Sequence, residues 1–149
     1  MASVQTTSLK VFIDSSVLYA AAYSENSTAR QLLLGIYSFP YRICVNEFVL
    51  EETRRNLSQD APDKLSALNI LLNYLGAPEE DASKELVLKA AEIVHLKDAP
   101  ILAGAVHAKA THLASYDKHH LLKHAQKIKE RFGIIVCDPA RILAVVASD

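Results

Sequence analysis

The chain has 149 residues, of which 50% are hydrophobic, and it carries a net charge of −1 at neutral pH. These values suit one domain with a sizeable core. A net charge of −1 means that the protein as a whole does not attract a polyanion such as nucleic acid, so binding to one would need local patches of positively charged side chains. Two cysteines and no basic-then-apolar leader exclude a disulfide framework and favour a reducing, cytoplasmic location without membrane attachment. We expect a flexible N-terminal extension over residues 1–8 and a single domain over residues 9–149.

Short apolar runs that are typical of buried strands alternate along the chain with stretches of helical spacing. The predicted strands cover residues 9–13, 41–45, 111–115 and 134–137. The predicted helices cover residues 46–57, 63–75, 99–108 and 140–145. This alternation predicts an α/β fold with a central parallel β-sheet flanked by helices, and it leaves the order of the strands open.

Two aspartates follow predicted strands directly. Asp14 ends the run 9–13, and Asp117 stands just beyond the run 111–115. Open α/β sheets place their ligand crevice outside the carboxyl ends of the strands. We therefore expect both carboxylates to line one crevice.

A third aspartate, Asp98, opens the predicted helix 99–108, with Pro100 in the first turn where its missing N–H does no harm. This helix leads into the strand before Asp117 and must pack antiparallel to it. The amino end of the helix thus returns to the carboxyl edge of the sheet, and Asp98 joins the other two aspartates.

A glutamate completes the predicted set. Glu52 lies six positions past Asn46, roughly 9 Å into the helix 46–57, which is close enough to lean back over the same edge. Glu51 points elsewhere, about 100° around the helix.

Each acidic residue also has a structural interpretation. Aspartate is a favoured N-cap residue, so capping alone could explain Asp14, Asp98 or Asp117, and Glu52 could belong to a solvated face. The joint pattern favours a divalent-metal site, because carboxylates that repel one another at one edge are costly without a cation.

The segments that carry these carboxylates resemble the PIN domains, most closely the small prokaryotic kind that includes the VapC ribonuclease toxins. The resemblance covers nearly the whole chain after about residue 8. It rests on the order and spacing of four motifs: Val11–Leu18, Val49–Glu52, Lys97–Ala105 and Ala114–Lys118.

The resemblance implies a metal-dependent ribonuclease that uses Mg²⁺ or Mn²⁺, a homodimer, and a short antitoxin that wraps each toxin. The implied acidic quartet is Asp14, Glu52, Asp98 and Asp117, with Ser115 and Ser15 as supporting hydroxyls. The chain departs from the family pattern where it has Asn46 instead of a common serine, Ser115 instead of threonine, and Lys97 instead of a second acid.

Hard oxygen ligands suit Mg²⁺ or Mn²⁺ better than zinc, and a metal-activated water would hydrolyse a phosphodiester such as RNA. Cationic side chains near the predicted site could hold phosphates of the nucleic acid. These predicted nucleic-acid-binding residues are Lys118, Lys123, Arg54 and Arg55.

Other reactive residues receive plainer interpretations. Cys44 and Cys137 lie in apolar runs and are expected to be buried, inert thiols. His120 and His124 have the i, i+4 spacing of some zinc sites, but they lack a third ligand nearby in sequence, which favours a solvated or RNA-facing surface. Exposed Leu and Tyr side chains of the helix 63–75 would make a dimer surface or a groove for a partner helix.

Three rival functions are open to this sequence pattern. A phospho-acceptor receiver domain would need an acidic pair near the first strand, where only Asp14 is present, and a haloacid dehalogenase phosphatase would need an aspartate where Ser16 stands. The harder rival is a PIN protein that is not a toxin and acts in RNA processing, or a nucleic-acid-binding module without strong catalysis. An adjacent gene for a DNA-binding antitoxin would favour the toxin.

Overall fold

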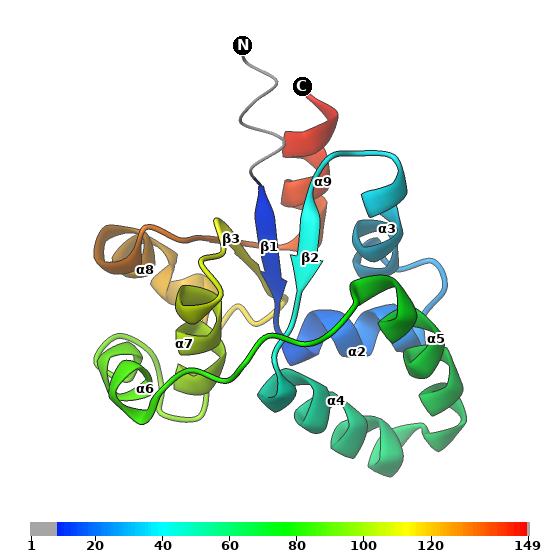
Figure 1. The fold of residues 1–149 in the computed structure, drawn as a ribbon, viewed down its shortest axis with the longest axis horizontal. Coiled ribbons are helices and arrows are strands. Elements are labelled where there is room, and N and C mark those ends of the chain that lie inside the picture. Colours follow the sequence, from blue (N-terminus) through cyan, green and yellow to red (C-terminus); the bar gives the residue numbers. More distant parts are fainter. Residues whose placement is uncertain (1–8, 149) are drawn as a thin grey trace.

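Four short parallel strands form the central sheet of the protein (Figure 1). They are β1 (Lys10–Ile13), β2 (Arg42–Cys44), β3 (His112–Ala114) and β4 (Ile135–Cys137), and their order in the sheet is β2-β1-β3-β4. The computed structural model describes residues 9–148, so the predicted flexible extension 1–8 lies outside the described residues. The predicted α/β class with a central parallel sheet is confirmed.

The register between the two central strands positions the candidate site. Ile13 at the end of β1 pairs with Ala114 at the end of β3, so Asp14 and Ser115 leave the sheet side by side. The ladder continues one step further, because the Asp14 N–H donates to the Ala114 carbonyl over 3.1 Å. Val11, Phe12 and Ile13 of β1 are fully buried, as the apolar run predicted.

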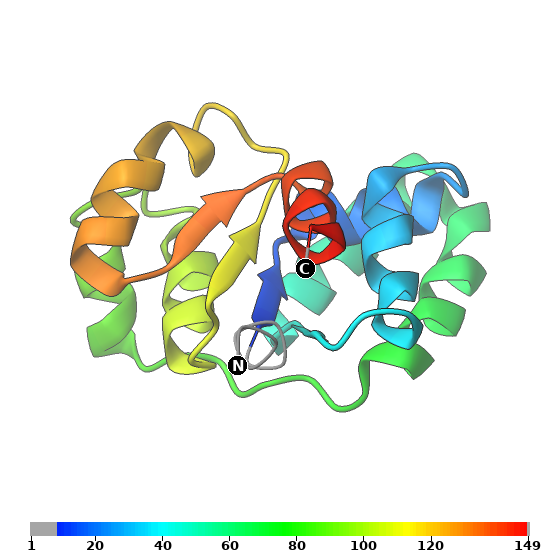
Figure 2. The same cartoon turned by 90° about the horizontal axis from the view of Figure 1, so that it is seen from above.

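Helices cover both sides of this sheet. They are α2 (Ser15–Tyr23), α3 (Thr28–Leu34), α4 (Glu47–Asp60), α5 (Leu65–Leu75), α6 (Lys84–Ala90), α7 (Ala99–His107), α8 (Ala125–Phe132) and α9 (Pro139–Ala147). Single 3₁₀ turns are η1 (Gly35–Tyr37), η2 (Pro62–Lys64) and η3 (Leu122–His124). Helices α6, α7 and α8 lie on one side of β1, and α3 and α5 lie on the other (Figure 1 and Figure 2).

The predicted helices differ from the observed ones mainly at their ends, because capping groups determine the residue at which each helix begins. Asn46 is the N-cap of α4 and not its first residue, because its Oδ1 accepts the Val49 N–H over 3.0 Å. The predicted helix 63–75 begins as the 3₁₀ turn η2 at Pro62 and continues as α5. No helix within residues 9–148 is long and apolar enough to cross a membrane.

Candidate metal centre

Asp14 is held at the carboxyl edge of the sheet by two serine hydroxyls. Its Oδ1 accepts hydrogen bonds from the Val17 N–H over 3.1 Å and from the Ser16 hydroxyl over 2.6 Å, and its Oδ2 accepts one from the Ser115 hydroxyl. Asp14 is therefore the N-cap of α2, and the same carboxylate faces the end of β3. Capping and a site role are compatible here, because each oxygen has two lone pairs.

The same two serines also tie down the loop that follows β3. The Ser115 hydroxyl accepts the Asp117 N–H over 2.9 Å, and the Ser16 hydroxyl accepts the Tyr116 N–H over 3.1 Å. Ser115 is fully buried. Ser115, predicted as a supporting hydroxyl, contacts Asp14, and so does Ser16, which was not among the predicted supporting residues although it lies in the motif Val11–Leu18.

Asp98 precedes α7 but does not cap it with its side chain. The residue is 8% exposed, and its Oδ2 has no hydrogen-bond partner within the described part of the chain. A buried carboxylate oxygen without a partner carries a large desolvation cost. A divalent cation would remove this cost, so the donor set at this edge fits a metal ion.

Asp117 directly precedes a turn after β3 and lies beside a histidine of that turn. Its Oδ1 accepts the backbone N–H groups of His119 and His120 over 3.1 Å each, and His120 Nδ1 lies 3.0 Å from Oδ2. One ligand atom from each of Asp98, Asp117 and His120 lies within 4.8 Å of the other two. The structure thus brings Asp98 and Asp117 together and adds His120, which sequence reasoning had assigned to a solvated or RNA-facing surface.

Glu52 reaches the edge from α4. Its Oε1 accepts a hydrogen bond from the Ser15 hydroxyl, next to Asp14, whereas Glu51 is exposed. This contact supports Glu52 over Glu51 and gives the predicted hydroxyl of Ser15 a partner. The group formed by Asp98, Asp117 and His120 does not include Glu52 or Asp14, although Asp117 lies close enough to Asp14 to raise its pKa beyond the effect of burial.

The electrostatics of the edge disfavour ionised carboxylates in the absence of a cation. Burial raises the pKa of Asp14 to about 6, against the opposing effect of the Ser115 hydrogen bond. The pKa of Asp98 is also raised, and burial is the largest cause. The neighbouring Asp117 carboxylate raises this pKa further, whereas His120 lowers it. A cation between these groups would reverse both shifts.

The predicted phosphate-binding cations all lie on the surface. Lys118 directly follows Asp117, and Lys123 lies in η3; Arg54 and Arg55 follow Glu52 on α4, and all four side chains are exposed. Lys97, which departs from the family pattern beside Asp98, is exposed as well.

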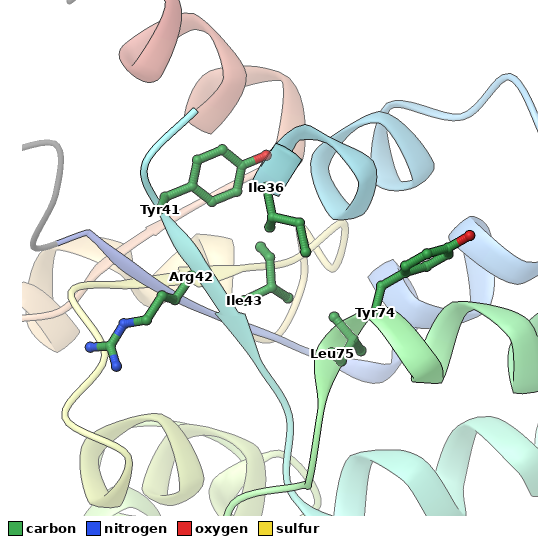
Figure 3. A pocket seen from close by; sticks show the side chains of 6 residues that line it. All are labelled: Ile36, Tyr41, Arg42, Ile43, Tyr74 and Leu75. Carbon is green, nitrogen blue, oxygen red and sulfur yellow. The ribbon is translucent and has the colours of Figure 1, made fainter. Parts of the chain in front are cut away.

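A cavity of about 220 Å³ lies apart from this edge, beside the start of β2 (Figure 3). Its lining residues are Ile36, Tyr41, Arg42, Ile43, Tyr74 and Leu75. The lining is mainly apolar and contains no member of the predicted quartet.

Both cysteines lie within the described residues and are free. Cys44 is buried and Cys137 is half-buried. Burial raises the pKa of each thiol to about 11, which makes both cysteines poor nucleophiles.

The model of the PIN domain family matches residues 11–128 of the chain. The protein belongs to the PIN-domain family, as the sequence motifs predicted. No curated protein matches the chain significantly.

Solved structures share the fold at low sequence identity. PAE2754 from Pyrobaculum aerophilum is 19% identical with a TM-score of 0.66, over 95% of this chain and 91% of that one. VapBC2 from Rickettsia felis, bound to a DNA fragment from its promoter, is 16% identical with a TM-score of 0.63, over 86% and 97%. VapC20 from Mycobacterium tuberculosis, a toxin that cleaves the sarcin-ricin loop, is 20% identical with a TM-score of 0.53, over 73% and 91%.

Proposed function

We propose that this protein is a metal-dependent endoribonuclease that hydrolyses RNA phosphodiester bonds at the carboxyl edge of its sheet. Membership of the PIN-domain family supports a nuclease. The observation that carries the metal requirement is Asp98, whose buried Oδ2 has no partner among the described residues and whose carboxylate lies within 4.8 Å of ligand atoms of Asp117 and His120. Carboxylate oxygens are the ligands that Mg²⁺ and Mn²⁺ prefer.

The acidic quartet of the proposal is Asp14, Glu52, Asp98 and Asp117. Asp98 and Asp117 would hold the cation directly, and Asp14 and Glu52 would bind it or the waters around it from the other side. A divalent cation held there would activate a water molecule and stabilise the charge on the leaving oxygen.

The hydroxyls of Ser115 and Ser15 orient two carboxylates of this quartet, those of Asp14 and Glu52. Ser115 donates to Asp14, and Ser15 donates to Glu52. Because Asp14 and Glu52 each accept a hydrogen bond from a hydroxyl, these two carboxylates would need little reorganisation when substrate arrives.

Exposed cations beside the acidic edge would hold the RNA backbone. Lys118 is next to Asp117 in sequence, and Arg54 and Arg55 follow Glu52 on α4. Phosphate contacts of this kind position the nucleic acid without reading its sequence, so the RNA target would be selected by shape.

We further propose that the protein is the toxin of a type II toxin–antitoxin pair in the cytoplasm. The shared fold with the VapBC2 and VapC20 proteins supports this role and, with it, an antitoxin partner. Free cysteines suit a reducing compartment. The alternative is a PIN protein of RNA processing, or a nucleic-acid-binding module without strong catalysis.

A homodimer would use the exposed apolar side chains of α5 and η1. Ile70 is 58% exposed, and Tyr37 and Tyr74 stack edge to face with their ring centroids 5.7 Å apart. Sedimentation analysis should give a dimer for the wild type and a monomer for Ile70→Glu. A monomeric wild type would refute this assembly.

Cleavage of labelled single-stranded RNA tests the nuclease. We expect products with Mn²⁺, none with EDTA, and none from Asp98→Asn, because that change removes the ligand charge without altering side-chain volume. Asp63→Asn is the matched control, since Asp63 is an exposed aspartate in η2. Equal cleavage by wild type and Asp98→Asn would refute the site, and cleavage by neither would favour the binding module.

A further inference from the structure

His120 stands where a further metal ligand would stand. We propose that Nδ1 of His120 is a nitrogen ligand of the divalent cation, so that the centre combines carboxylates with an imidazole and prefers Mn²⁺ and Co²⁺ over Mg²⁺. This inference rests on the proposed function, because it concerns the cation of the same site.

The distances between the ligand atoms fit a metal coordination sphere. In an octahedral site with ligands at about 2.1 Å, neighbouring ligand atoms lie about 3 Å apart and opposite ones about 4.2 Å apart. His120 Nδ1 lies 3.0 Å from Asp117 Oδ2, and the group that includes Asp98 stays within 4.8 Å. His120 and Asp117 already have the spacing of neighbouring ligands, whereas a spacing of up to 4.8 Å to Asp98 would have to shorten for all three donors to share one ion.

The buried oxygen of Asp98 is independent evidence that this group takes a ligand. Asp98 is 8% exposed, and its Oδ2 lacks a partner within the described residues. A surface cluster of acids could be satisfied by water, but a buried oxygen of this kind needs a specific partner. A cation held between Asp98, Asp117 and His120 supplies one.

The imidazole of His120 is 52% exposed, and two neighbouring residues restrict where it can lie. Its backbone N–H is bound by Asp117, and its ring packs edge to face against the His95 ring, with centroids 6.1 Å apart. The His95 ring is fixed in turn, because its Nδ1 accepts the Lys97 N–H over 3.0 Å. A ligand whose orientation is set before binding loses less entropy when the metal arrives.

A competing explanation is that His120 only orients Asp117 through their hydrogen bond. The two roles differ in metal selectivity. Imidazole favours transition metals, in the increasing order Mn²⁺, Co²⁺, Ni²⁺, whereas Mg²⁺ prefers oxygen. Loss of a nitrogen ligand should therefore weaken Co²⁺ most and Mg²⁺ least, while loss of a positioning contact should weaken all metals alike.

Calorimetric titration of the full chain with Mg²⁺, Mn²⁺ and Co²⁺ separates these roles. For His120→Ala we expect affinity for Mn²⁺ and Co²⁺ to fall by about tenfold or more, with a smaller loss for Mg²⁺. The visible absorption spectrum of bound Co²⁺ should change in parallel. His119→Ala is the matched control, since its backbone N–H, which the variant keeps, makes the contact with Asp117.

His120→Asn can still donate to Asp117 but offers no nitrogen ligand, so it should bind with the reduced selectivity of His120→Ala. Equal losses for all three metals, recovery of full affinity in His120→Asn, or unchanged binding in His120→Ala would each overturn the proposal. If the wild type binds none of the three cations, or if Asp98→Asn leaves binding unchanged, the metal site of the proposed function fails as well.

Discussion

The hydroxyl of Ser115 donates a hydrogen bond to Oδ2 of Asp14, from a position 101 residues further along the chain. The contact joins the ends of the two central strands, and both residues are buried. The geometry of the candidate centre therefore depends on a side chain that is not itself expected to bind the metal.

We expect Ser115→Ala to destabilise the protein by about 1–3 kcal/mol, because it leaves a buried carboxylate oxygen without its donor. Urea unfolding in the presence of EDTA measures this loss without a contribution from metal binding. Ser66→Ala, an exposed position on α5, should change stability little. A Ser115→Ala protein as stable as wild type would show that the oxygen finds another partner.

The raised pKa of Asp14 predicts that the metal-free protein loses stability as the pH rises. Burial raises this pKa from 3.8 to about 6. The folded state therefore holds the proton more tightly than the unfolded chain does. The cost of ionising the group is absent below about pH 4, grows between pH 4 and pH 6, and reaches roughly 3 kcal/mol above that.

Comparison with Asp14→Asn isolates this effect. The stability difference between wild type and variant, measured by urea unfolding with EDTA, should shift against the wild type between pH 4.5 and pH 7.5. Saturating Mn²⁺ should restore the stability that the wild type loses at high pH, and it should not produce the same gain in Asp14→Asn. A difference that stays constant across this pH range would contradict the assignment.

Gly104 allows α7 to pack closely against the segment before α4. A Cβ at this position would collide with Asn46 Nδ2 and lie 3.0 Å from Phe12 Cζ. Gly104→Ala should therefore cost about 1–3 kcal/mol, even though alanine favours helix by about 1 kcal/mol. The measurement is the free energy of unfolding.

A second change at Asn46 tests the cause of this loss. Asn46 Nδ2 is buried and without a partner within residues 9–148, whereas Oδ1 caps α4. Asn46→Ser keeps a capping oxygen and removes the colliding atom, so Gly104→Ala should cost less in that background. Additive losses would place the strain at Phe12.

Cations beside the acidic edge should set the salt dependence of RNA binding. Replacing Lys118 and Lys123 by alanine should weaken binding for all RNA sequences and lower the slope of log affinity against log salt by about 1–2. Lys84→Ala, an exposed lysine at the start of α6, is the control. An unchanged slope would exclude both lysines from phosphate contact.

The convergence of Asp14, Asp98 and Asp117 could be predicted, because parallel strands and a returning helix impose it. The distance into the helix 46–57 predicted that Glu52 could reach the edge, but the choice of Glu52 over Glu51 depended on the resemblance to the PIN family. The order of the strands could not be predicted, since each apolar run suits a central position equally well. The partner of each carboxylate oxygen also depends on side-chain packing that the sequence pattern does not encode.

The sequence did not identify His120 as a neighbour of the acidic residues, and the local structure explains why. Its spacing from His124 is helical, but residues 118–121 form a turn, and η3 begins only at Leu122. The Asp117 carboxylate stabilises that turn by accepting two backbone N–H groups, and this brings His120 back beside it. The spacing of Asp117 and His120, three residues apart, is the sequence feature that could have indicated this contact.

The last strand of the sheet has a consequence for the order in which the site is assembled. The Ser115 N–H donates to the Cys137 carbonyl of β4 over 3.0 Å, although all four carboxylates of the quartet lie at or before residue 117. A ribosome therefore delivers every acidic ligand and both central strands before it delivers β4, the strand that pairs with the outer side of β3. An incomplete nascent chain would carry the ligands with one edge of β3 unpaired, and only the finished sheet would support that strand from both sides.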